Sequence, residues 1–189
     1  RVMSRVAALE SLLDERIVIL DGAMGTRIQE LRLTEEDYRG KRFSDWEISL
    51  KGNNDLLSLT QPEAIGAIHH EFLKAGADVI TTNTFGANRM RLSPFGLVDR
   101  LEEINASGVR LAREVARDRA WVAGSMGPIG AELAPVGKVA PGEAYKIFKE
   151  QASVLDEAGV DLFVLETFSR IEEMRSANIR RRSGASVSI

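Results

Sequence analysis

Two acidic side chains, one amide and two glycine-rich turns follow apolar runs in this 189-residue sequence, where they are suited to binding a small polar ligand. Asp21 and Glu166 offer carboxylates, and Asn83 offers an amide. The glycine-rich turns, at residues 22–25 and 124–127, let the backbone approach a ligand closely, and N–H groups at the start of a following helix attract an anionic group. Together these groups match the ammonium and the carboxylate of a zwitterionic amino acid.

A second interpretation of the two carboxylates stays open at this stage. An aspartate at the end of a strand often caps the helix that follows it, and for Asp21 this interpretation is as good as ligand binding. It is weaker for Glu166, because Thr167 and Ser169 behind it are better capping residues.

The elements that must position these residues form a repeating order of apolar runs and helical patterns. Strands are expected at residues 17–20, 79–82, 121–123 and 162–165, and helices at 4–13, 62–75, 98–117, 143–158 and from 171 onward. Strands that are apolar on both faces and alternate with helices predict β/α units around a parallel sheet. Four units make half of an eightfold barrel or a small doubly wound sheet, and both bind ligands at the carboxyl ends of their strands.

Two connecting stretches carry separate predictions. Residues 32–59 are polar and aperiodic, which predicts one long ordered loop. The sequence TQPE at residues 60–63 predicts a capping box at the start of the following helix.

An internal repeat links two of the candidate residues. Residues 74–85 align with residues 157–168: each segment reads as a helix end, a glycine, an aspartate, a strand, a polar residue and the pair Thr-Phe. The alignment makes Asn83 equivalent to Glu166, just beyond the end of its strand. Chance similarity between two helix-to-strand turns is the alternative.

Composition excludes several classes of function. The sequence has no cysteine, so disulfides, thiolate metal sites and a cysteine nucleophile are excluded. Its net charge of −3 argues against a nucleic-acid partner, and the lack of a long apolar run argues against a membrane span. His69 and His70 are the only histidines, and as neighbours on a helix they do not share a metal easily. A cytoplasmic protein is expected.

Seven segments together resemble a known family. They read LDGAMGT at 20–26, RGKRFSDW at 39–46, KGNNDLL at 51–57, TQP at 60–62, TNTF at 82–85, GSMGP at 124–128 and ETF at 166–168. In this order and spacing they resemble the N-terminal homocysteine-binding domain of cobalamin-dependent methionine synthases, over residues 5–178. The GNND segment favours these synthases over the betaine- or S-methylmethionine-dependent homocysteine methyltransferases.

The resemblance implies a fold of the (β/α)₈ TIM-barrel family with only about the first four β/α units present. Residues 1–178 would be the N-terminal half of the barrel and residues 179–189 an atypical tail, as expected of a truncated or frameshifted product. The family transfers a methyl group from methylcobalamin, regenerated from methyltetrahydrofolate, to the zinc-bound thiolate of homocysteine. Zinc, cobalamin and the cobalamin- and folate-binding modules of the full-length enzyme are thus implied.

The resemblance also assigns roles to residues of the candidate site. Asp21 and Glu166 would hold the ammonium of homocysteine. The backbone around Ala23, Met24 and Gly25 would meet its carboxylate, and Asn83 would line the same pocket.

The sequence departs from the family at the metal. The family's zinc ligands are three cysteines in the second half of the barrel, and this chain has none. We therefore expect no methyl transfer by the chain alone. One alternative is a non-catalytic half-barrel that self-associates through open sheet edges. Others are a betaine- or S-methylmethionine-type relative and a module that binds a different amino acid.

Overall fold

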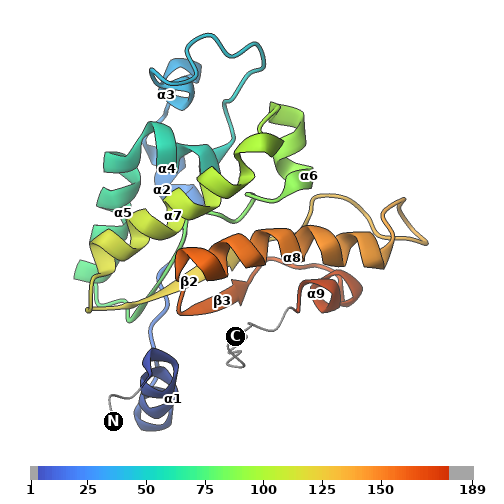
Figure 1. Ribbon diagram of the computed structural model, residues 1–189. Helices are drawn as coiled ribbons and strands as arrows, with labels where there is room; N and C mark the ends of the chain where they lie inside the picture. The colour runs from blue at the N-terminus through green and yellow to red at the C-terminus, as the bar shows by residue number, and fades with distance from the viewer. Residues whose placement is uncertain (1–3, 179–189) are drawn as a thin grey trace.

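The computed structural model describes residues 4–178, which form an open parallel sheet packed against helices (Figure 1). The sheet contains β1 (Val79–Thr81), β2 (Trp121–Met126) and β3 (Leu162–Leu165), with β2 in the centre. Both pairs are parallel, with Val79 beside Trp121 and Ala123 beside Leu162. The predicted α/β class is confirmed, and three of the four predicted strands form where they were expected.

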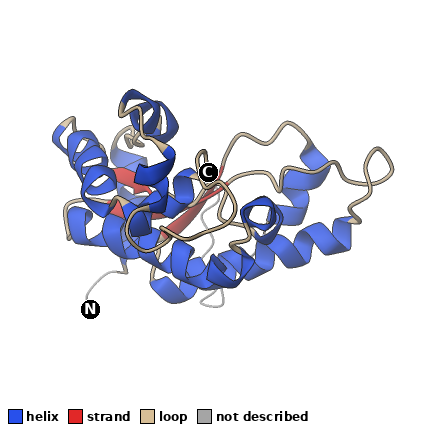
Figure 2. Cartoon of the chain, turned by 90° about the horizontal axis from the view of Figure 1, so that it is seen from above, coloured by secondary structure: helices blue, strands red, loops and turns tan. Residues whose placement is uncertain are grey.

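Three long helices lie alongside the strands (Figures 1 and 2): α5 (Pro62–Lys74), α7 (Leu101–Ala116) and α8 (Pro141–Ala158). Helices α5 and α8 end before the predicted glycines, and Gly76 and Gly159 have the positive φ that such stops need. The shorter helices are α1 (Arg5–Glu15), α2 (Met24–Glu30), α3 (Glu35–Arg39), α4 (Leu57–Thr60), α6 (Arg89–Leu92) and α9 (Ile171–Ala177). None of the described helices is long and apolar enough to cross a membrane.

The two faces of the sheet bury different sets of residues, because side chains alternate along a strand. Ile80, Val122 and Phe163 belong to the large core that includes Phe148 of α8. On the opposite face, side chains from all three strands form a smaller cluster around Leu9 of α1: Val79, Ala123, Leu162 and Val164. Among the described residues, Leu9 is the one helical residue in this cluster.

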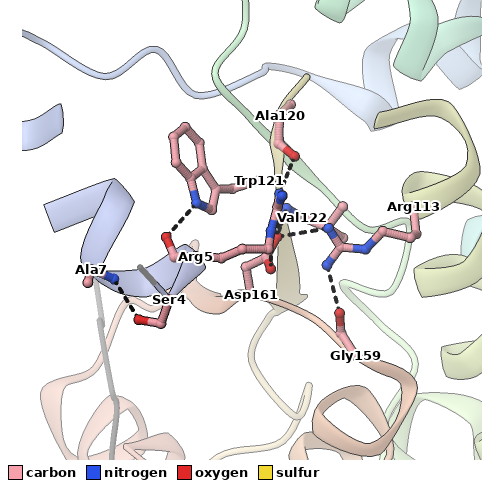
Figure 3. A network of polar contacts seen from close by, with 9 residues as sticks. All are labelled: Ser4, Arg5, Ala7, Arg113, Ala120, Trp121, Val122, Gly159 and Asp161. Atoms are coloured by element: carbon pink, nitrogen blue, oxygen red, sulfur yellow. Dashed lines mark hydrogen bonds and ion pairs between the residues drawn. The ribbon is translucent and has the colours of Figure 1, made fainter. Parts of the chain in front are cut away.

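Helix α1 is fixed at the amino-terminal edge of the sheet by a polar network (Figure 3). Arg5 donates from Nε to Asp161 Oδ1 at 2.8 Å, and Arg113 donates from Nη1 to Asp161 Oδ2 at 3.0 Å. The Val122 N–H donates to the same Oδ2 at 2.8 Å, and Trp121 Nε1 donates to the Arg5 carbonyl at 2.8 Å. Asp161 therefore joins α1, α7 and the start of β2 in one cluster.

The first predicted strand, at residues 17–20, is wrong as a buried strand. The segment runs beside β1, with a single parallel bridge between Leu20 and Val79, and Ile19 accepts hydrogen bonds from the N–H groups of Asp78 and Val79. Ile17 is 82% exposed and Leu20 is 43% exposed. Among the described residues no element covers this side of the segment, so an apolar run alone does not make it a buried strand.

Two predictions about residues 32–63 are also wrong. The expected long loop contains α3 and α4, because Thr34 and Asp37 form a reciprocal capping box that starts α3. The capping box expected at residues 60–63 does not form: Gln61 occupies the cap position with no side-chain bond. Proline at the first position of α5 is confirmed.

The predicted division at residue 178 coincides with the last described residue. The atypical tail expected at residues 179–189 therefore falls in the part of the chain that the structure does not describe.

Candidate functional site

A pocket of about 720 Å³ lies at the carboxyl ends of the strands. It is lined by the side chains that follow the strand ends and by the segment around residues 52–55. All six residues predicted from the sequence line it: Asp21, Ala23, Met24, Gly25, Asn83 and Glu166. The sheet thus brings together residues that are far apart in the sequence.

Asp21 lies beside the end of β1 and is held there by Thr81. Its Oδ2 accepts from the Thr81 N–H at 2.9 Å, and its Oδ1 accepts from Thr81 Oγ1 at 3.0 Å. No side chain caps α2, whose cap position is Ala23, so the helix-capping interpretation of Asp21 is wrong. Burial raises the pKa of Asp21 to about 6, against the hydrogen bonds from Thr81, and the negative charge of Glu166 raises it further.

Glu166 follows β3 directly and is oriented by the neighbouring strand. Ser125 of β2 donates from Oγ to Glu166 Oε1 at 2.5 Å. The next residue, Thr167, has φ of +63°, a left-handed conformation that few residues with a Cβ adopt. A strained turn therefore follows Glu166, and such strain often accompanies functional sites.

Asn83 plays a different part from the two carboxylates. Its Nδ2 donates to the Asn54 carbonyl at 2.7 Å and to Ser58 Oγ at 3.2 Å. The side chain is 5% exposed, so it fixes the segment around residues 53–58 against the sheet while it lines the pocket. As the repeat predicted, Asn83 and Glu166 both lie just beyond the ends of their strands.

The start of α2 presents backbone to the pocket. Ala23, Met24 and Gly25 line it, and no side-chain cap satisfies the first N–H groups of this helix. Open space lies where a Cβ of Gly25 would be. The N–H groups at the start of a helix favour an anionic group, which agrees with the predicted role of this turn.

Sequence reasoning missed two charged residues of the pocket, Asp55 and Arg91. Asp55 is 8% exposed and accepts from the Gly86 N–H at 3.0 Å. Burial raises the pKa of Asp55 to about 6, and the Gly86 hydrogen bond and the positive charge of Arg91 oppose that shift. A Cβ on Gly86 would lie 2.7 Å from Asp55 Oδ2, so a larger residue there would displace the Asp55 carboxylate. The GNND segment contains Asp55, but its residues indicate a family resemblance and do not show that Asp55 lines the pocket.

The described residues do not fit the zinc ion that the family resemblance implies. Within residues 4–178 no group of three or more His, Asp or Glu side chains is arranged to hold a metal ion, and the sequence has no cysteine. His69 is fully buried in α5, where burial lowers its pKa to about 4, and His70 is exposed. No step of the chemistry is therefore assigned to zinc in this chain.

Comparison with known proteins identifies a family and similar solved structures. The homocysteine S-methyltransferase family profile matches residues 18–189. The homocysteine methyltransferase MmuM from Escherichia coli, in its metallated form, superimposes with a TM-score of 0.70 at 23% identity, over 89% of this chain and 60% of that one. Its oxidized form gives a TM-score of 0.70 at 24% identity, over 89% and 59%. The chain thus spans about 60% of the length of these structures, whose likeness supports the fold.

Proposed function

Because this chain belongs to the homocysteine S-methyltransferase family, we propose that its pocket binds homocysteine as part of a methionine synthase. In such an enzyme the methyl group passes from methylcobalamin, regenerated from methyltetrahydrofolate by other modules, to the homocysteine sulfur. The observation that carries the proposal is the pair of carboxylates, Asp21 and Glu166, in one pocket with the uncapped start of α2.

The two carboxylates are suited to an ammonium group for an electrostatic reason. Without a cation, the charge of Glu166 opposes ionisation of Asp21. A bound ammonium favours the ionised form of Asp21, so it lowers the pKa of Asp21 and gains binding energy from the same change. The N–H groups of Met24 and Gly25 would hold the amino-acid carboxylate, and Ser125 and Thr81 keep the two acidic side chains in place.

Calorimetry with homocysteine tests this proposal, using the 189-residue chain and the variants Asp21→Asn and Glu166→Gln. We expect each variant to weaken binding by roughly tenfold or more, since a charge-assisted contact is lost. 4-Mercaptobutyrate, which lacks the ammonium, should bind wild type and both variants with the same low affinity. Equal affinity of the three proteins for homocysteine would contradict the assigned role, and tighter binding of another amino acid would favour a different substrate.

We propose that methyl transfer to homocysteine requires groups that residues 4–178 do not provide. When bound in the family, zinc supplies the thiolate at neutral pH, and the described residues provide no site for it. We expect no methylation of homocysteine by the isolated chain from methylcobalamin, betaine or S-methylmethionine. Zinc-dependent turnover by this chain alone would contradict that expectation, and the methyl donor used would identify the subfamily.

A second candidate function is supported by the open edges of the sheet. β3 pairs with β2 alone among the described strands, and Ile17 and Ile19 beside β1 are 82% and 49% exposed. Unpaired edges and exposed apolar side chains favour pairing with another chain. Light scattering at micromolar concentration should therefore give a dimer or a larger species, and a stable monomer would count against this candidate.

A further inference from the structure

The pocket is larger than the proposed amino-acid site requires. Pockets of roughly 300–1,000 Å³ take ligands of drug size, and the present one has a volume of about 720 Å³. Homocysteine is a small amino acid, and its proposed contacts use only the strand ends and the start of α2. The remaining wall is formed by the 52–55 segment, α6, the turn that follows α6 and the residues after β2, including Arg91, Phe95 and Ile129.

Arg91 is the one cationic side chain among the described residues that line this pocket. Its Nε donates to the Pro128 carbonyl at 2.7 Å, and its guanidinium lies over the Phe85 ring at 5.3 Å from the centroid. A Cβ on Gly130, whose φ is +83°, would lie 3.4 Å from both Cγ and Nε of Arg91. The side chain is therefore positioned by the Pro128 carbonyl and the Phe85 ring, and Gly130 leaves room for it.

The outer end of this guanidinium carries no protein partner. Within residues 4–178, neither Nη atom of Arg91 makes a hydrogen bond or an ion pair, although Nε is bonded. Asp55 lies nearby, but it accepts from Gly86 and forms no ion pair with Arg91. The two Nη atoms of Arg91 therefore remain available to a ligand, and a fixed guanidinium presents a planar fork that matches carboxylate or phosphate.

Arg91 also acts on a different part of the pocket from the two ammonium-binding carboxylates. Its positive charge opposes the rise that burial causes in the pKa of Asp55, whereas the charge that bears on Asp21 is that of Glu166. We propose that Arg91 is an oxyanion-binding residue, which holds the carboxylate or phosphate group of a second ligand beside the amino-acid end of the pocket. The proposal rests on the proposed function in one respect, which is that homocysteine occupies the end of the pocket with Asp21 and Glu166.

Titration of the 189-residue chain with sodium acetate and with sodium phosphate, followed by NMR at constant ionic strength, tests this assignment. The signals are the Nε–H of Arg91 and the N–H groups of Gly86 and Gly130. We expect a saturable response to acetate, phosphate or both, which identifies the preferred anion. Arg91→Met should weaken binding by roughly tenfold or more, and Arg91→Lys should fall between, since it keeps the charge but loses the fork.

The matched control is Arg175→Met, which removes an exposed arginine of α9 outside the pocket and should bind the anion as wild type does. Saturating homocysteine should leave anion binding unchanged. Absence of saturation with both anions, wild-type affinity in Arg91→Met, or competitive displacement of acetate by homocysteine would each overturn the proposal. A chain that binds acetate but not homocysteine would instead contradict the proposed function and leave the anion site standing.

Discussion

The pKa values of buried carboxylates shift in opposite directions at the two ends of the sheet. At the amino-terminal edge, burial acts to raise the pKa of Asp161, but hydrogen bonds from Arg5, Arg113 and the Val122 N–H hold it below its usual value (Figure 3). At the carboxyl end, burial raises the pKa values of Asp21 and Asp55 to about 6, and no arginine forms an ion pair with either within the described chain.

The difference separates a stabilising end from a binding end. In β/α folds, residues at the amino ends of the strands contribute to stability, whereas residues at the carboxyl ends contribute to function. Here the first end compensates the burial of its charge inside the protein. The second end leaves charges uncompensated, so a ligand of opposite charge can supply the missing interaction.

The largest expected effect comes from breaking the stabilising end. Asp161→Asn removes the charge that two arginines and one backbone N–H share, and it leaves Arg5 and Arg113 facing each other. Asp161 is buried, but the side chains of Arg5 and Arg113 are 40% and 32% exposed. A hydrogen bond between charged groups contributes about 1.5–3 kcal/mol. Since Asp161→Asn weakens two such bonds, we expect the free energy of unfolding, measured by urea denaturation, to decrease by about 3 kcal/mol.

Glu10→Gln is the control for Asp161→Asn, because Glu10 lies on the exposed side of the same helix α1 that the network anchors. It should change stability by less than about 0.5 kcal/mol. If Asp161→Asn is as mild as this control, the network does not anchor α1 and the contrast between the two ends fails.

The dependence of stability on pH should have opposite signs at the two ends. The folded-state pKa values of Asp21 and Asp55 lie near 6, above the ordinary 3.8. Their contribution to folding stability is therefore full below pH 3.8 and is lost as the pH rises through 6. The pKa values of Asp78 and Asp161 are lowered, so their contribution is present above pH 3.8 and is lost as the pH falls through the lowered values.

Asp21→Asn isolates the carboxyl-end contribution to this pH dependence. We expect the variant to match wild type near pH 4 and to be more stable by about 1–2 kcal/mol at pH 7, because it no longer ionises. Denaturation across pH 4–7 measures the difference. A variant that is less stable than wild type at pH 7 would mean that the ionised carboxylate contributes stability, contrary to the comparison.

The sequence predicted the carboxyl end better than the rest because strand ends are local signals. The apolar runs at 79–82 and 162–165 with their following polar residues placed Asn83 and Glu166 correctly, since parallel strands bring their ends to one edge. The boundaries of β2 and the start of α3 are harder to predict from the sequence. They depend on tertiary pairing with β3 and on the capping pair Thr34–Asp37.

Arg91 and Asp55 show what a local pattern cannot supply. Each sits in a segment without strong periodicity, and each reaches the pocket only because α6 and the 52–55 segment fold back over the strand ends.

The exposure of Ile17 also depends on tertiary structure. Burial of an apolar run requires a neighbouring element, and within the described residues none covers that side.

The smallest expected effect concerns a residue that positions another. Ser125→Ala removes the hydroxyl that donates to Glu166 Oε1 at 2.5 Å. One hydrogen bond contributes about 1 kcal/mol, so we expect stability to change by no more than this and homocysteine affinity to fall by less than tenfold, with the loss absent for 4-mercaptobutyrate. Ser176→Ala, in α9 and outside the pocket, is the control. A loss as large as that of Glu166→Gln would mean that Ser125 itself contacts the ligand, which would extend the binding end onto β2.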